Sequence, residues 1–263
     1  MSKQNSEKPY KIQTTALGYK IYHYNNVYST NDTAKEIAKK TSEERIVVLA
    51  EAQTRGKGRL GRRWISPKGG VWLSIILRPR ITPIEALKLT FITSSAVAKT
   101  IKTMFGLMTE VKWPNDVLVN GRKICGILTE TSSKRKSVES MVVGVGINAN
   151  IDLECFSPSL RDAVTSLQYE LGHKIKRKAL TRNLLRNFEH RYKCLQRGLW
   201  NALLQEWKSM ATFLGEQVQI TSFDDVLAGE AWDIDEDGAL VIRLENGTLE
   251  KVVVGDLTLR KQP

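Results

Sequence analysis

The sequence has few cysteines, few histidines and no long apolar run, and each shortage excludes a class of protein. Its 263 residues include 3 Cys and 3 His. Cys125, Cys155 and Cys194 lie far apart without metal-ligand spacing, so we expect three packing residues in a reducing compartment. No run of about 18 apolar residues occurs, which predicts no membrane span. Residues 1–8 lack the apolar core of a secretory signal, so the expected location is cytoplasmic.

Two common nucleotide-binding motifs are also missing. No Walker P-loop pattern occurs. Gly56 to Gly61 matches the dinucleotide fingerprint G-x-G-x-x-G literally, but that fingerprint needs a helix directly after it. Residues 62–70 contain a proline and two more glycines, which are turn signals. The sequence therefore predicts neither a P-loop nor a Rossmann site.

Basic residues outnumber acidic ones, which raises the question of nucleic acid binding. There are 40 Lys+Arg against 28 Asp+Glu, giving a net charge of +12. The cations concentrate in residues 55–63, 134–136 and 174–182, without interleaved aromatic residues or a helix-turn-helix pattern. About twenty residues precede the first core segment, too few for a winged helix. We therefore expect no specific DNA binding, and charge that attracts acidic partners.

The most informative segment is residues 53–64, which contain three glycines and five cations. Glycines allow main-chain N–H groups to converge on a ligand, and a bound anion would relieve repulsion among the cations. This predicts a loop that cradles a small anionic ligand, is mobile without it, and has no carboxylates nearby in sequence to hold its cations. A solvated basic loop without a ligand is the alternative.

Two further segments indicate a polar site. Asn120-Gly121, the preferred dipeptide of a type I′ turn, separates apolar residues 117–119 from 124–128, which predicts a hairpin. The hairpin brings Lys112, Asn115, Asp116 and Lys123 to one region, and an amide, a carboxylate and two ammonium groups suit an ATP-dependent site. A surface hairpin with ion-paired charges is the alternative. Residues 141–150 form an apolar strand interrupted by Gly144 and Gly146, which indicates either close backbone approach or a sharp bend.

The remaining chain predicts an α/β domain followed by a small β domain. We expect a short helix over 33–40 with cap-forming residues before it, and a longer helix opened by Pro83. Residues 71–77 predict a central strand, and 177–210 predict two helices separated by Gly198. From residue 213 short strands alternate with turns such as 223–225, 235–238 and 246–247, typical of a small antiparallel barrel or meander.

Five motifs occur in order over about residues 20 to 150: Ser29-Thr30-Asn31, Gln53 with Gly56 to Trp64, Lys112-Trp113-Pro114-Asn115-Asp116, Lys123 to Leu128, and Gly144 to Asn148. Together they closely resemble the biotin protein ligase family. The sequence departs from the family at Lys57, where arginine is common, and at Leu60, where arginine is frequent.

The resemblance implies a mixed sheet flanked by helices, like the class II synthetase-like biotin/lipoate ligase fold, with an SH3-like β domain at the C-terminus. The implied organisation is an N-terminal extension (1–20), a catalytic domain (21–211) and the small β domain (212–263). It also implies ATP-dependent formation of biotinyl-5′-adenylate, followed by transfer to a lysine of a biotin carboxyl carrier protein. ATP and biotin would be substrates, with Mg²⁺ accompanying ATP. The resemblance does not identify the metal ligands. It also leaves the oligomeric state open, with a homodimer as one possibility.

The resemblance also implies residue roles. Lys123, Arg59 and Asp116 would be catalytic, with Asp116 orienting or deprotonating the incoming lysine. The implied biotin contacts are Ser29, Thr30, Asn31, Gln53, Lys57, Gly58, Arg59, Lys123 and Gly126. The implied ATP or adenylate contacts are Arg62, Trp64, Lys112, Asn115, Lys123 and Asn148.

Two rival functions remain. A lipoate or octanoyl ligase has a related fold and the same adenylate chemistry, but those enzymes lack the basic glycine loop beside the 112–116 motif. A basic DNA- or RNA-binding protein is the non-enzymatic rival. Ser29 to Asn31 could also simply cap a helix.

Overall fold

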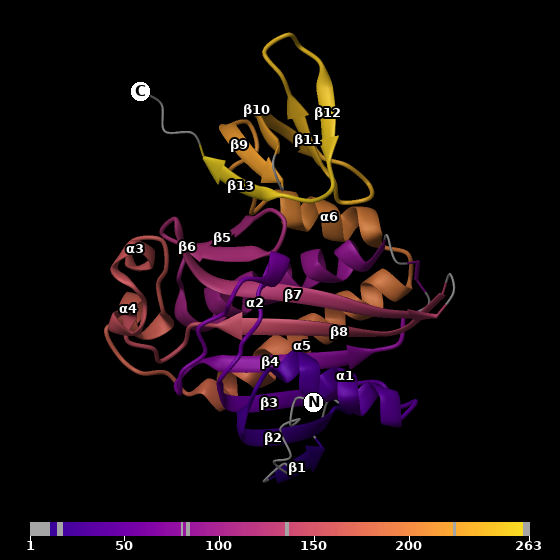
Figure 1. The fold of residues 1–263 in the computed structure, drawn as a ribbon, viewed down its shortest axis with the longest axis vertical. Helices are drawn as coiled ribbons and strands as arrows, with labels where there is room; N and C mark the ends of the chain where they lie inside the picture. Colours follow the sequence, from indigo (N-terminus) through magenta and orange to yellow (C-terminus); the bar gives the residue numbers. More distant parts are fainter. Residues whose placement is uncertain are drawn as a thin grey trace.

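The computed structural model describes residues 11–14, 18–79, 81–82, 85–134, 137–222 and 225–259. Within these residues, an eight-stranded sheet lies below a five-stranded sheet (Figure 1). The larger sheet has the order β1-β2-β3-β4-β8-β7-β6-β5. It is mixed, because β2 and β3 are parallel and all other neighbours are antiparallel. Its strands are β1 Lys11–Thr14, β2 Lys20–Val27, β3 Ile46–Gln53, β4 Val71–Leu77, β5 Thr109–Lys112, β6 Asp116–Val119, β7 Arg122–Lys134 and β8 Ser137–Ile147.

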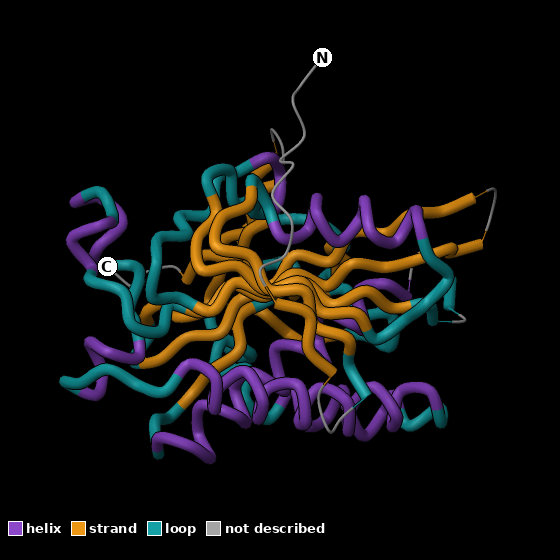
Figure 2. Tube along the Cα trace, turned by 90° about the horizontal axis from the view of Figure 1, so that it is seen from below, coloured by secondary structure: helices purple, strands orange, loops and turns teal. Residues whose placement is uncertain are grey.

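Helices cover both faces of the larger sheet (Figure 2). Helix α1 (Thr30–Lys40) packs against β3, β4 and β8, whereas α2 (Ala86–Phe105) packs against β7 and β5. Helices α5 (Arg177–Gln196) and α6 (Trp200–Lys208) pack against α2, and α5 also pairs with β3 through Arg177 and Glu51 (2.8 Å). Two short helices, α3 (Pro158–Arg161) and α4 (Leu167–Leu171), follow β8. The predicted mixed sheet flanked by helices is therefore confirmed.

The strand predicted over 71–77 is confirmed as β4, and its position explains its composition. Every residue of β4 is buried, because β3 and β8 flank it and helices cover both faces. A strand buried on both faces is apolar along its whole length instead of alternating. Ser74 is the one polar residue within β4, and its hydroxyl lies against Asn31 of α1.

The predicted hairpin is also confirmed. Asn120 and Gly121 have φ values of 51° and 70°, which a type I′ turn requires, and they join β6 to β7. Strand β5, which pairs with β6, is absent from the sequence prediction. It is four residues long and carries two charges in Thr-Glu-Val-Lys, so alternation is too short to identify it.

Helix boundaries differ slightly from the predicted ones. Helix α1 begins at Thr30 instead of residue 33, because Ser29 is its N-cap and accepts a long hydrogen bond from the Asp32 N–H (3.5 Å). Helix α2 begins at Ala86; Pro83, predicted to open it, lies outside the described residues. The two helices predicted over 177–210 are α5 and α6.

The C-terminal residues form a five-stranded antiparallel sheet, as predicted, in the order β12-β11-β10-β9-β13. It contacts the main domain through side-chain to main-chain bonds: Trp113 donates to the Gly238 carbonyl (3.0 Å) and Trp200 to the Glu236 carbonyl (2.6 Å). Lys208 of α6 and Asp233 of β10 add an ion pair at 2.6 Å. The strands are β9 Gln217–Ser222, β10 Asp225–Ile234, β11 Leu240–Arg243, β12 Leu249–Val252 and β13 Asp256–Leu259.

Other expectations have mixed outcomes. Strand β1 lies within the 1–20 extension and pairs with β2, so part of that segment joins the main sheet. Cys125 is buried, but Cys155 is exposed and Cys194 half-buried, so the packing prediction is wrong for Cys155. Residues 135–136 of the basic turn and 223–224 of the predicted acidic turn lie outside the described part. No helix in the described ranges has the length and apolar character needed to cross a membrane.

Candidate active site

The basic glycine loop folds back on itself as a small hairpin. Trp64 N donates to the Gly56 carbonyl (2.9 Å), and Gly58 N donates to the Arg62 carbonyl (2.7 Å). A Cβ on Gly56 would lie 2.4 Å from the Trp64 carbonyl oxygen, so this crossing requires glycine. Gly58 meets no such obstacle, since the nearest atom to its Cβ would be 3.5 Å away.

Carboxylates from elsewhere in the chain hold three of the loop cations. Lys57 Nζ lies 2.7 Å from Asp32 Oδ1 of α1. Arg62 forms an ion pair with Asp256, the first residue of β13, and Arg59 Nη1 lies 3.9 Å from the same carboxylate. The carboxylates that pair with these cations thus come from distant segments, where a search of the neighbouring sequence does not find them.

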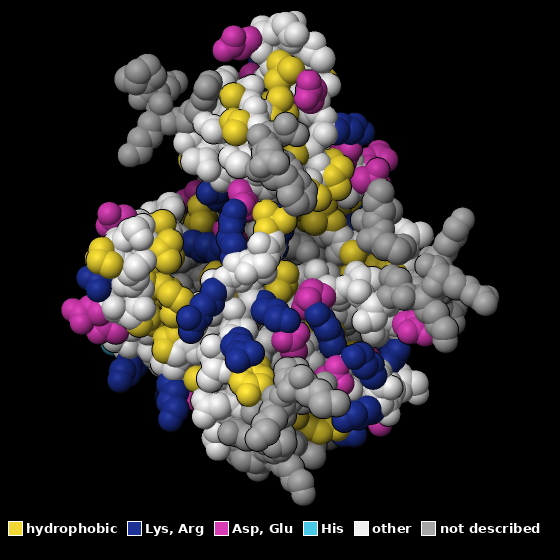
Figure 3. Space-filling model, in the orientation of Figure 1, with side chains coloured by type: hydrophobic (Ala, Val, Ile, Leu, Met, Phe, Trp, Pro, Cys, Tyr) yellow, Lys and Arg dark blue, Asp and Glu magenta, His cyan; other side chains and the backbone are white. Residues whose placement is uncertain are grey.

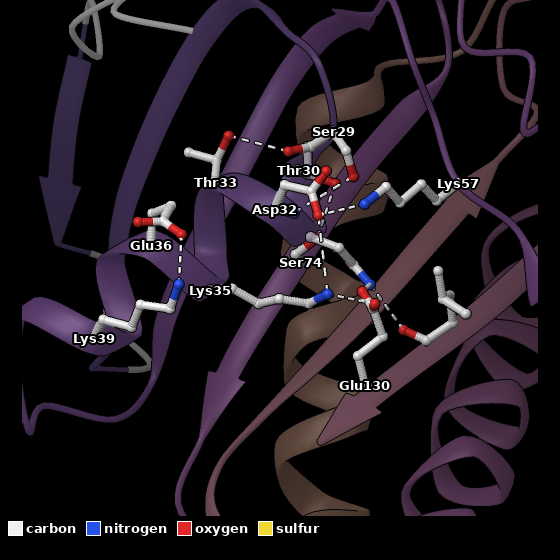
Figure 4. Close-up of polar contacts among 12 residues, drawn as sticks. Ser29, Thr30, Asp32, Thr33, Lys35, Glu36, Lys39, Lys57, Ser74 and Glu130 are labelled. Carbon is white, nitrogen blue, oxygen red and sulfur yellow. Dashed lines mark hydrogen bonds and ion pairs between the residues drawn. The ribbon is translucent and has the colours of Figure 1, made fainter. Parts of the chain in front are cut away.

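A polar network lies at the start of α1 (Figure 4). The Ser74 hydroxyl donates to Asn31 Oδ1 (2.6 Å), and Asn31 Nδ2 donates to Glu130 Oε2 (2.8 Å). Lys35 pairs with the other Glu130 oxygen. Thr30 N donates to Gln53 Oε1 (2.7 Å), linking α1 to the end of β3. Ser29 to Asn31 thus both begin the helix and form a rigid polar wall.

Two glycines on strand β8 make room for side chains of this site. A Cβ on Gly144 would lie 2.2 Å from Asn31 Oδ1, and one on Gly146 would lie 2.4 Å from Trp64 Nε1. Strand β8 keeps regular pairing with β4 and β7 through both glycines. Close approach, and not a sharp bend, is therefore the reason for glycine in this strand.

The hairpin of β6 and β7 contributes a charged pair. Lys123 Nζ lies 2.7 Å from Asp116 Oδ1 and 5.2 Å from the centre of the Trp64 ring. Arg59 Nη1 lies 3.3 Å from Asn115 Oδ1, so the loop and the hairpin meet. Burial lowers the pKa of Arg59 below its ordinary value, although arginine keeps its charge.

These elements enclose one pocket of about 300 Å³. Apart from Lys112, all the predicted site residues line it. Lys112 is half-buried beside Asp116 in the β5–β6 pairing, and burial lowers its pKa. Figure 3 shows Lys and Arg side chains gathered on the main domain below the small sheet. The predicted residues on the lining are Ser29, Thr30, Asn31, Gln53, Lys57, Gly58, Arg59, Arg62, Trp64, Asn115, Asp116, Lys123, Gly126 and Asn148.

Sequence reasoning missed two parts of the lining. An apolar wall comes from Phe156, Leu160 and Val164, in the segment after β8. Isolated apolar residues in a segment of short helices carry no recognisable pattern. Asp256, from the small sheet, also lines the pocket, and a single aspartate at a strand start gives no signal of proximity to a loop 194 residues earlier.

Three buried polar atoms on the lining have no hydrogen-bond partner among the described residues, and one of them, Asp116 Oδ1, forms the ion pair with Lys123. The other two are Trp64 Nε1, a donor, and Asn148 Oδ1, an acceptor. The Asn148 side chain is fixed by its other end, since Nδ2 donates to the Thr165 carbonyl (3.0 Å). An unpaired buried polar atom is costly, so this donor and acceptor are suited to hydrogen-bond a polar ligand.

No dedicated metal centre is formed by the described residues, which contain no group of three or more His, Cys, Asp or Glu placed to hold an ion. The two carboxylates on the pocket lining, Asp116 and Asp256, are each paired with a cation. The donor set therefore does not fit a resident metal.

The fold and the pocket define a protein ligase of the biotin and lipoate class. Residues 25–148 match the model of the Biotin/lipoate A/B protein ligase family, and residues 213–260 match the Biotin protein ligase C terminal domain. The chain is 34% identical over 255 residues to the bifunctional ligase/repressor BirA of Bacillus subtilis, covering 97% of this chain and 78% of that protein.

Two further comparisons agree. The biotin–[acetyl-CoA-carboxylase] ligase of Paracoccus denitrificans is 32% identical over 200 residues, covering 74% of this chain and 83% of that protein. The Aquifex aeolicus biotin protein ligase, in complex with biotin and ATP, superposes with a TM-score of 0.78 at 25% identity, covering 92% of this chain and 99% of that one. The chain belongs to the biotin protein ligase family.

Proposed function

We propose that this protein is an ATP-dependent biotin protein ligase. In the first step a carboxylate oxygen of biotin attacks the α-phosphorus of ATP, and pyrophosphate leaves. In the second step the amine of a carrier lysine attacks the acyl carbon of biotinyl-5′-adenylate; an amide forms, and AMP and a proton leave. The observation that carries this proposal is the single pocket on which the motif residues meet, with buried polar atoms still unpaired.

The chemistry requires the enzyme to hold two anions together, since both nucleophiles are substrates. Lys123 extends into the pocket beside Asp116, where its ammonium group can bridge the biotin carboxylate and an α-phosphate oxygen. Lys57 and Arg59 supply further positive charge from the loop. Positioning and neutralisation of this kind lower the barrier without a covalent enzyme intermediate.

The remaining residues receive binding roles in this proposal. Ser29, Thr30 and Asn31 present a fixed polar wall to the ureido ring of biotin, supported by Ser74 and Glu130. Asn148 and Trp64 offer an acceptor and a donor, and Gly126, which lines the pocket beside the Trp64 ring, contacts the bound biotin. Lys112 lies off the pocket lining, so its contact with ATP depends on a change when ATP binds.

Asp116 orients or deprotonates the incoming lysine in this proposal, once phosphate has drawn Lys123 away from it. We propose that Mg²⁺ arrives on the phosphates of ATP as part of the substrate, since the described residues hold no dedicated site. The acceptor is a biotin carboxyl carrier protein, which the names of the Paracoccus relative and this family support.

Biotin-dependent exchange of labelled pyrophosphate into ATP tests the first step. We expect exchange with biotin and none with lipoate or octanoate. Exchange with lipoate alone would favour the lipoate ligase rival, and no exchange with any of the three acids would reject the adenylate mechanism. Transfer of labelled biotin to a purified carrier domain then tests the second step.

A further inference from the structure

A negatively charged side chain from the small sheet lies in a pocket built for anions. Asp256 begins β13 and is 29% exposed. It pairs with Arg62, and its other oxygen lies 3.9 Å from Arg59. The preceding carbonyl, of Gly255, accepts a hydrogen bond from Arg59 Nη1 at 3.2 Å. Two consecutive residues, Gly255 and Asp256, therefore contact Arg59 and Arg62 of the loop.

The electrostatics of this contact are informative. A carboxylate on the lining repels incoming phosphate, so it opposes the binding for which the cations are suited. Arg59 is only 20% exposed and meets Asn115 and Gly255 through neutral oxygens. Without ligand, a guanidinium held out of water needs a nearby negative charge, and Asp256 supplies it.

We propose that Asp256 is an internal counter-ion for Arg59 and Arg62, and that the phosphates of ATP displace it. The inference rests on the proposed function for the identity of the anion. In this proposal Asp256, a residue of the small sheet, sets the affinity of the active site for nucleotide. Phosphate replaces the carboxylate at the arginines, and the segment 253–256 loses its ion pair with the loop.

The consequence of displacement is local to the end of the small sheet. The sheet stays attached to the main domain through the Trp113 and Trp200 hydrogen bonds and the Lys208–Asp233 ion pair, none of which involves the pocket lining. Val253 and Val254, directly before the contact, are already exposed. We therefore expect ATP to loosen residues 253–259 without detaching the sheet.

The sign of a change in the KM for ATP tests the proposal. D256N removes the charge but keeps the shape, so the KM for ATP should fall about three- to tenfold, because one repulsion and one competing ion pair are lost. D256E keeps the charge and should return the KM to within about twofold of the parent. If Asp256 merely held the loop in shape, D256N would raise the KM, which overturns the proposal, as does an unchanged KM.

D233N is the matched control, because it also breaks an ion pair between the small sheet and the main domain, but away from the pocket. Its KM for ATP should equal that of the parent. An equal fall in D233N would mean that general loosening of the sheet, and not the charge of Asp256, sets affinity; the proposal would then be rejected.

Hydrogen exchange in the unmutated protein provides a test that no folding defect can obscure. ATP with biotin should accelerate amide exchange in residues 253–259 while the loop, residues 56–64, becomes protected. Unchanged or slower exchange in 253–259 contradicts displacement. If the parent protein catalyses biotin-dependent pyrophosphate exchange but these tests fail, the role of Asp256 is rejected and the proposed function stands. If the parent protein lacks that exchange activity, the proposed function itself is rejected.

Discussion

At the scale of single residues, the pocket is a set of cations that already have partners. Lys57 is paired with Asp32, Arg62 with Asp256 and Lys123 with Asp116. The sequence could predict the cations and Asp116 because they occur in compact motifs, but not Asp32 and Asp256, which come from other segments. When phosphate binds, each cation therefore exchanges a carboxylate for a phosphate oxygen. Its contribution to the binding free energy is the difference between the free energies of these two ion pairs.

Replacement of Lys123 by alanine should nearly abolish adenylate formation. The Lys123 side chain is 29% exposed, and the proposed contact of its ammonium group strengthens as charge develops on the phosphate. Loss of such a contact costs roughly 2–4 kcal/mol, or about 30- to 1,000-fold in rate. Biotin-dependent pyrophosphate exchange measures it, and turnover within about threefold of the parent would remove Lys123 from the mechanism.

Lys88→Ala provides the control for this variant. Lys88 also pairs with a carboxylate, Glu85 (2.9 Å), and also lies over an indole, that of Trp200 (5.5 Å), but it is not on the pocket lining. Exchange by Lys88→Ala should match the parent. A similar loss of exchange activity in both variants would mean that removing any lysine that lies over an indole ring has this effect, and that the position of Lys123 in the pocket is not its cause.

At the scale of secondary structure elements, the sequence-based prediction was most accurate where neighbouring residues alone determine the conformation. The Asn120-Gly121 turn and the apolar strand β4 need no information from elsewhere. The glycines of β8 were recognised as unusual, but close approach and a bend stayed equally open. Only the positions of Asn31 and Trp64, which pack onto that strand from other elements, separate the two explanations.

Gly146→Ala should displace Trp64 and raise the KM for biotin. The new methyl group would lie 2.4 Å from Trp64 Nε1, so the indole must move. Overpacking of this kind costs about 1–3 kcal/mol. In a Trp64→Leu background, Gly146→Ala should have less than half its effect on KM, because the obstructing ring is gone. Equal effects in both backgrounds would show that Trp64 is not the reason for glycine.

The start of α2 should give a pH-dependent contribution to stability. The Thr82 N–H donates to Glu85 Oε2 (2.9 Å), and this bond, with Lys88, lowers the pKa of Glu85 below its ordinary value of 4.5. A lowered folded-state pKa stabilises the protein above pH 4.5, and that stabilisation is lost as the pH falls through the folded-state pKa. Glu85→Gln should therefore destabilise at pH 7 by about 0.5–1 kcal/mol, or about 1–4 °C.

Thermal melts across pH check this prediction. The difference between parent and Glu85→Gln should shrink as the pH falls from 5 towards 3. Glu36→Gln removes only an ion pair with Lys39 on α1, without a main-chain donor, and should cost less at pH 7. A Glu85→Gln difference that is constant with pH would exclude the charge as its cause.

At the scale of the whole molecule, the sequence predicted two parts but not how they meet. The pattern of short strands after residue 213 indicated the small sheet, and a family match to residues 213–260 agrees. The contact between them joins Asp256 to a loop 194 residues earlier. Periodicity and turn signals are local, whereas this proximity depends on how the small sheet attaches to the main domain through Trp113, Trp200 and Lys208. The domain limits at 20 and 211 stay predictions.

The net charge of +12 should give association with DNA that depends on salt and not on sequence. Cations of the loop are engaged by Asp32 and Asp256, and the turn at 235–237 presents acidic residues, with Asp235 itself paired to Lys251 (2.8 Å). If about four phosphates are neutralised, affinity should fall by on the order of 10² between 50 and 200 mM salt.

Fluorescence anisotropy with a biotin-operon promoter duplex and a scrambled duplex should give the same affinity for both. Preference for the promoter that survives 200 mM salt and increases with biotinyl-adenylate would instead show that this chain reads base edges, which charge alone cannot do.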